Sequence, residues 1–191
     1  MTDLEAIQLA EDLGFARRIR RSRRNGLGAR LPVSLVWGFS LSLAGFLRDT
    51  GTTHLWLLIP LTIGASLVTM VLGARLRQDS GELTTSMDRK ASIHWTVTGL
   101  VMLAGLLALP SSGPGPRMVI GLLAASHLLA GFTLETSYFI TAGTLSLGVL
   151  YLEFGPKGFA SGYPWMLAGT VAWACLVAGA LLGKVVYRHG R

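Results

Sequence analysis

The chain has 191 residues, of which 51% are hydrophobic and only 14% are charged, and its formal net charge is +7. A soluble domain usually carries about 25% charged residues spread along the chain, so this composition argues against a soluble globular domain. The single cysteine, Cys175, excludes an intramolecular disulfide and a cysteine-based metal cluster.

Residues 1–30 form a polar segment ahead of an apolar body (residues 31–191). Thr2 and Glu5 have the spacing of a capping box, and apolar residues recur as far as Phe15. This pattern predicts an amphipathic helix over residues 2–24, and it has no apolar stretch like that of a cleaved signal peptide. The end of the predicted helix holds six arginines, which we call the arginine run: Arg17, Arg18, Arg20, Arg21, Arg23 and Arg24.

The arginine run predicts that this segment stays on the cytoplasmic side of a membrane. An arginine at the centre of a bilayer costs about 2.5–3.5 kcal/mol, so a cluster of arginines does not cross readily. We expect the run to contact anionic lipid headgroups or an acidic cytoplasmic protein. Nucleic acid ranks below both, because no aromatic side chains are interleaved with the arginines.

Six apolar stretches follow, each close to the roughly 20 residues that cross the hydrocarbon of a bilayer. We split the fourth from the fifth at Glu135, because one helix over residues 118–152 would be too long for a single span. Pro60 is expected to kink the second helix. The predicted fold is therefore an all-α integral membrane protein, a six-helix bundle with helices over residues 31–47, 55–74, 93–109, 118–134, 136–152 and 163–183.

The basic residues support an even number of spans. Of the 17 Lys and Arg residues, only Arg48, Arg117 and Lys157 fall in predicted outer loops, which leaves fourteen on the cytoplasmic side. Because basic residues favour cytoplasmic loops, both termini are predicted to be cytoplasmic, in a bacterial-type cell (inner) membrane. Aromatic residues near the outer ends are expected to form a belt at the headgroups: Trp56, Tyr151, Phe154, Phe159, Tyr163 and Trp165.

Similar short segments suggest three helical hairpins. Leu43–Leu47 matches Leu103–Leu107, and glycines recur at similar spacing in the even-numbered stretches. Small residues also recur at intervals of four, which lets helix backbones approach closely. These residues serve either packing within the chain or the interface of a homo-oligomer: Ala65, Thr69, Gly73, Cys175, Gly179 and Gly183.

His127 is the one ionisable side chain well inside a predicted span, which makes it a candidate functional residue. The alternative is a neutral imidazole bonded to a neighbouring polar group. Glu135 lies near the same helix face if the helix continues that far, and could couple to His127. His94 is predicted to lie nearer the inner edge than His127, which argues against haem ligation, and no HExxH motif, P-loop or dinucleotide motif occurs.

These features predict a non-enzymatic membrane protein that acts as a regulatory or accessory partner. It would present the basic N-terminal helix and the long inner loop Arg75–Ser92 to a cytoplasmic protein, although that loop could also be a solvated linker. The alternative is a small oligomeric transporter or channel with His127 on the pathway. The first is favoured because the spans carry few polar groups, and a solute pathway needs them. No cofactor or metal is predicted.

The predicted topology can be tested by labelling introduced cysteines from outside intact cells. We expect cysteines at Ser112 and Ser161 to react with a membrane-impermeant reagent, because both fall in predicted outer loops. Cysteines at Ser22 and Ser80 should react only after the membrane is permeabilised. Reaction at Ser80 in intact cells would contradict the topology.

Overall fold

The structure of the chain is a computed structural model that describes residues 14, 31–51, 56–80, 86–109, 114–155 and 162–189. The arginine run lies outside the described residues. Within these ranges the chain is helical and has no strand, so the predicted all-α fold is confirmed. The first long helix is Leu31–Asp49, and five more follow it: α2 (Leu58–Ser80), α3 (Ser86–Ala108), α4 (Gly115–Thr133), α5 (Tyr138–Phe154) and α6 (Pro164–His189).

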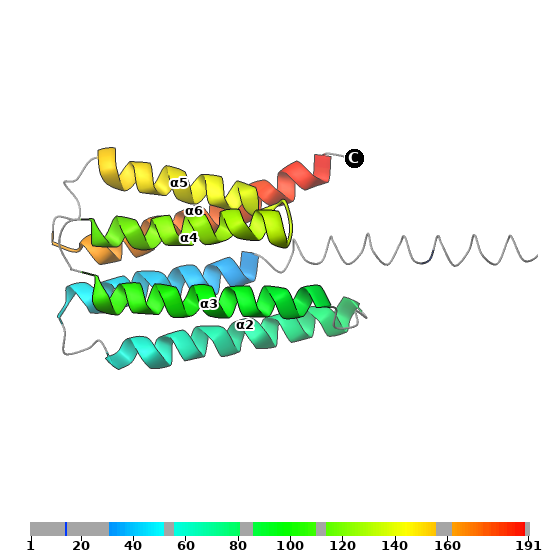
Figure 1. Cartoon of the computed structure of the whole chain (residues 1–191), viewed down its shortest axis with the longest axis horizontal. Helices are drawn as coiled ribbons and strands as arrows, with labels where there is room; N and C mark the ends of the chain where they lie inside the picture. Colours follow the sequence, from blue (N-terminus) through cyan, green and yellow to red (C-terminus); the bar gives the residue numbers. More distant parts are fainter. Residues whose placement is uncertain are drawn as a thin grey trace, which may run out of the picture.

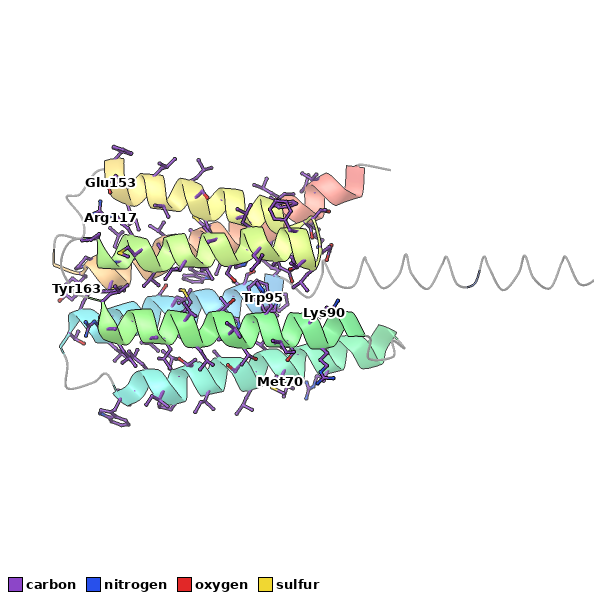
Figure 2. All side chains as sticks on the ribbon, viewed as in Figure 1. Met70, Lys90, Trp95, Arg117, Glu153 and Tyr163 are labelled. Carbon is purple, nitrogen blue, oxygen red and sulfur yellow. The ribbon has the colours of Figure 1, made fainter. Side chains whose placement is uncertain are left out.

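Figure 1 shows these helices side by side with their axes roughly aligned. α4 lies between α3 and α5, α2 flanks α3 at one edge, and α6 packs on both α4 and α5. The start of helix Leu31–Asp49 and the end of α6 lie at the same end of the bundle (Figure 1). We call this the Lys90 end and the opposite one the Arg117 end, after residues labelled in Figure 2.

A short turn separates α4 from α5, as the sequence predicted. The N–H groups of Leu134 and Glu135 both bond to the Ala130 carbonyl, at 2.8 and 3.0 Å, which ends α4. Ser137 is fully buried in the turn, and its hydroxyl donates to the Glu135 carboxylate at 2.7 Å. Because α4 ends before Glu135, the premise that the helix continues to this residue is wrong.

The connection between α2 and α3 is much shorter than predicted. α2 continues to Ser80 and α3 begins at Ser86, so most of the expected loop Arg75–Ser92 is helical. A change from apolar to charged residues marks the end of a membrane span but not of a helix, because Arg, Gln and Lys are good helix formers. The kink expected at Pro60 is also wrong, since Pro60 lies in the first turn of α2, where its missing N–H costs nothing.

Helix Leu31–Asp49 is joined to α6 through a carboxylate. Asp49 accepts hydrogen bonds from the backbone N–H groups of Trp165 and Met166, at 3.2 and 2.8 Å. These N–H groups are at the start of α6 and have no partner within the helix, so Asp49 caps α6 and stabilises the positive end of its dipole. The neighbouring Arg48 donates to the Leu109 carbonyl at 2.8 Å, which ties the same helix to the end of α3.

Glycines allow the two helices to touch along their backbones. A Cβ atom on Gly45 would lie within 3.0 Å of the Trp165 backbone, and one on Gly169 would lie equally close to Leu41. Trp165 is 2% exposed in the core, so its predicted place in a lipid-facing belt is wrong, whereas Trp56 is 65% exposed. The capping of α6 holds Trp165 inside the bundle.

Large apolar side chains cover the outside of the described helices. Met70 on α2, Leu100 on α3 and Leu147 on α5 are each more than 60% exposed. Soluble proteins rarely expose such continuous apolar surface. Five helices are long and apolar enough to cross a membrane, and α5 is apolar but shorter, with 17 residues. These features are consistent with an integral membrane protein.

The glycine contact predicts opposite effects for two similar substitutions. Gly45→Ala should destabilise the fold by about 1–3 kcal/mol, because its Cβ meets backbone that cannot move independently. Gly64→Ala is the control: Gly64 is in α2 with nothing within 4 Å of an added Cβ, and alanine should stabilise the helix by about 0.5–1 kcal/mol. Thermal unfolding in detergent measures both, and equal midpoints would contradict the packing.

Candidate functional site

Polar and aromatic side chains from α3, α4 and the start of α5 meet near the Lys90 end. α3 and α4 are antiparallel neighbours, so the early turns of α3 lie beside the late turns of α4. This register brings His94 and Trp95 level with Ser126 and His127. Figure 2 labels Trp95 where α3 faces α4.

His94, Thr98 and Ser126 form a closed circuit of hydrogen bonds. His94 Nε2 is 3.0 Å from the Ser126 hydroxyl and 3.1 Å from the Ser126 carbonyl, and a carbonyl can only accept, so Nε2 carries the proton. Thr98 donates to the His94 carbonyl at 2.9 Å. Ser126 therefore donates to the Thr98 hydroxyl, 2.6 Å away, which closes the circuit.

His127 is 7% exposed and is held by its own helix and by two aromatic rings. Its Nδ1 donates to the Leu123 carbonyl at 2.9 Å, one turn earlier in α4. The centroid of its ring lies 4.9 Å from that of Trp95 and 6.0 Å from that of Tyr138. These contacts fix the orientation of the imidazole and favour a structural role.

The predicted difference in depth between the two histidines is wrong. His94 bonds to Ser126, the residue before His127, and the Trp95 ring contacts both imidazoles. Sequence spacing alone could not reveal this, because the relative depth depends on the register of α3 against α4. The difference in depth therefore no longer argues against haem ligation. Across the described ranges, no three His, Cys, Asp or Glu side chains cluster as metal ligands.

The distance between Ser126 and His94 resembles that of a serine nucleophile and its base, but the chemistry does not fit. His94 Nε2 carries a proton that it donates, so it cannot accept the Ser126 proton as a general base. Ser126 is also in the interior of α4, where the backbone N–H groups are bonded within the helix. They cannot form an oxyanion hole beside the hydroxyl.

A groove of about 600 Å³ runs along the outer face between α3 and α4, next to this cluster. Lys90 and Thr133 lie at its Lys90 end, and His94, Thr98 and Ser126 form part of its wall. The rest of the lining is apolar: Ile93, Val97, Val101, Met102, Leu122, Ala125, Leu129 and Leu134. The wall of the groove therefore combines polar side chains near the Lys90 end with an otherwise apolar lining.

The other predicted site residues are dispersed. Glu135 is exposed in the turn and is bound by Ser137, and the arginine run is not among the described residues. Within α6, Cys175 packs against Gly148 and Gly179 packs against Thr141, both in α5. These small residues therefore serve packing within the chain.

Sequence reasoning missed the groove and the polar circuit beside it. His94 and Thr98 are four residues apart, a spacing that places them on one face of α3, and this was an available signal. Their partner Ser126 is 32 residues from His94, and only the antiparallel register brings it close. Comparison with protein-family models, curated proteins and solved structures found no match to the chain.

The structural role of His127 predicts a graded response to substitution. His127→Ala should lower the stability by about 2–4 kcal/mol, because it leaves a cavity against Trp95 and Tyr138. His127→Leu fills most of that volume and should cost clearly less, and thermal unfolding in detergent measures the difference. If His127→Leu folded normally but abolished a proton flux that wild-type protein supports in vesicles, the structural role would be contradicted.

Proposed function

We propose that the protein is a six-span integral membrane protein of a bacterial-type cell membrane, with both termini in the cytoplasm. The exposed apolar surface supports insertion, and the shared end of the first and last helices supports an even number of spans. The charge distribution supports the orientation. At the Lys90 end, basic side chains are exposed on three helices: Arg75, Arg89, Lys90 and Lys184. At the Arg117 end, Arg117 pairs with Glu153.

Within that membrane, the protein acts as a non-enzymatic regulatory or accessory partner. The observation that carries this proposal is that six hydroxyl groups in the described spans bond to carbonyls of their own helices and take no part in the circuit of His94, Thr98 and Ser126. Each donates to a carbonyl four residues earlier, at 2.8–2.9 Å: Ser40, Thr62, Ser66, Thr69, Ser146 and Thr170. Helices of this kind support a scaffold whose recognition surface lies outside the membrane.

The surface proposed for recognition is the basic N-terminal segment at the Lys90 end. The arginine run attracts anionic headgroups, which holds the segment near the membrane, and it also suits an acidic cytoplasmic protein. Because the connection between α2 and α3 is short, it contributes less to this surface than the sequence suggested. The N-terminal segment is therefore the main recognition surface in this proposal.

The alternative is a small oligomeric transporter or channel, and one observation favours it. Two histidines and two hydroxyl groups lie at one level of the bundle, which is unusual for spans that are otherwise apolar. Against it, His127 is enclosed by aromatic rings, and the His94 circuit is closed on itself. A solute pathway would need polar groups along the whole length of the bundle, so the regulatory role is preferred.

The partner proposal predicts that charge at the N-terminus decides binding. We expect tagged wild-type protein, extracted in mild detergent, to retain one cytoplasmic protein at a constant ratio. Replacing Arg17, Arg18 and Arg20 with Gln should weaken that binding by roughly threefold to a hundredfold, at about 0.2–1 kcal/mol for each exposed charge pair.

The control removes three charges from the C-terminus. Replacing Lys184, Arg188 and Arg191 with Gln should leave the bound protein at its wild-type ratio, as measured by quantitative mass spectrometry. Equal losses in the two variants would point to non-specific charge attraction and contradict the proposal. Capture of no cytoplasmic protein by wild type would contradict it as well.

A further inference from the structure

We propose that the groove between α3 and α4 is a binding site for one anionic phospholipid from the leaflet at the Lys90 end. The phosphate would lie at Lys90 and one acyl chain would lie along the apolar lining. The inference rests on the proposed membrane insertion of the bundle. It adds a defined lipid site to that proposal, and it does not depend on the arginine run or on a protein partner.

The groove opens toward the lipid and not toward an aqueous channel. Ile93, Val97 and Leu129 line it and are 54–57% exposed on the outside of the bundle. In a membrane, the molecules that face such a surface are lipids. Its volume of about 600 Å³ falls within the range of about 300–1,000 Å³ typical of ligand pockets.

The lining changes from polar to apolar along the groove, as a phospholipid changes from its headgroup to its acyl chains. Lys90 and Thr133 lie at one end, and Val101, Met102 and Leu122 lie toward the other. From Lys90 to Met102 the lining extends over twelve residue steps of α3, or about 18 Å at about 1.5 Å per residue. One leaflet contributes about half of a hydrocarbon core of roughly 30 Å, so the groove matches one leaflet in depth.

Charge at the polar end selects an anion. The Lys90 side chain is exposed, and its flexible stem lets the ammonium reach the level of the headgroups while its methylene groups cover apolar surface. A lipid whose headgroup carries net negative charge is therefore favoured over a zwitterionic lipid, whose headgroup has no net charge.

The middle of the groove accepts an acyl chain because its polar groups are already bonded. His94 Nε2 and the hydroxyls of Thr98 and Ser126 bond to one another and to the backbone, so these three groups require no polar partner from the ligand. Ala125 leaves space between them and the exposed leucines on α4. A small side chain at this position keeps the groove open, and a large one would fill it.

The test uses full-length protein in nanodiscs that contain equal amounts of phosphatidylglycerol and phosphatidylcholine, followed by native mass spectrometry of the lipid retained after release. Wild type should retain one phosphatidylglycerol in preference to phosphatidylcholine. Lys90→Gln should reduce the preference about fivefold, which corresponds to about 1 kcal/mol for one basic residue. Lys184→Gln removes an exposed charge from the same end of the bundle and should leave the preference unchanged.

A second pair of variants tests the groove itself. Ala125→Phe should abolish retention of both lipids, because the ring occupies the space of the acyl chain. Ala104→Phe is the matched control, since Ala104 is an exposed alanine on α3 outside the groove, and it should retain lipid as wild type does. Thermal unfolding identifies any variant whose fold is changed, and the Lys90→Gln result stands independently of that measurement.

Three outcomes would overturn the site: equal retention of both lipids by wild type, equal effects of Lys90→Gln and Lys184→Gln, or full retention by Ala125→Phe. Each of these can occur in a protein that inserts normally. Failure of the proposed function is a different observation, in which the wild-type chain stays in aqueous solution and does not enter nanodiscs.

Discussion

The bundle depends on the bond between the first long helix and the last. The Asp49 carboxylate satisfies two N–H groups at the start of α6, and Gly45 and Gly169 let the same two helices touch through their backbones. Trp165, one of the two residues that donate, is buried, so leaving this helix start unpaired would be costly. This contact joins segments more than 110 residues apart and encloses Trp165, the largest of the most deeply buried side chains. The remaining helices pack around the resulting core.

The same requirement explains why so few polar groups are available for chemistry. In a medium without water, each hydroxyl or imidazole must find a partner within the protein. His127 bonds to the helix that carries it, and His94 bonds to Ser126 and the backbone. Buried polar groups bonded in this way add specificity to the packing of α3, α4 and α5. They leave the two ends of the bundle and its lipid-facing surface as the places where function is expected.

The two ends of the bundle differ in charge, and this difference links the proposals. At the Arg117 end, Asp49 caps a helix and Arg117 pairs with Glu153, so charges there stabilise the fold. At the Lys90 end, where the helix Leu31–Asp49 begins, exposed basic side chains lie on α2, α3 and α6. The proposed protein partner and the proposed lipid would both meet the molecule at this basic end.

The sequence by itself determined the number and order of the helices. Long apolar stretches form helices in any apolar surroundings, because each backbone group finds its partner four residues away, and Glu135 with its neighbours was enough to locate the turn before α5. The sequence also identified His127 as a buried polar residue. Only the tertiary structure decided that Trp165 is inside, that His94 lies beside Ser126, and that a groove runs beside them. These features depend on the rotation and register of one helix against another, which are set by contacts between residues far apart in the chain and leave no periodic signal in either segment.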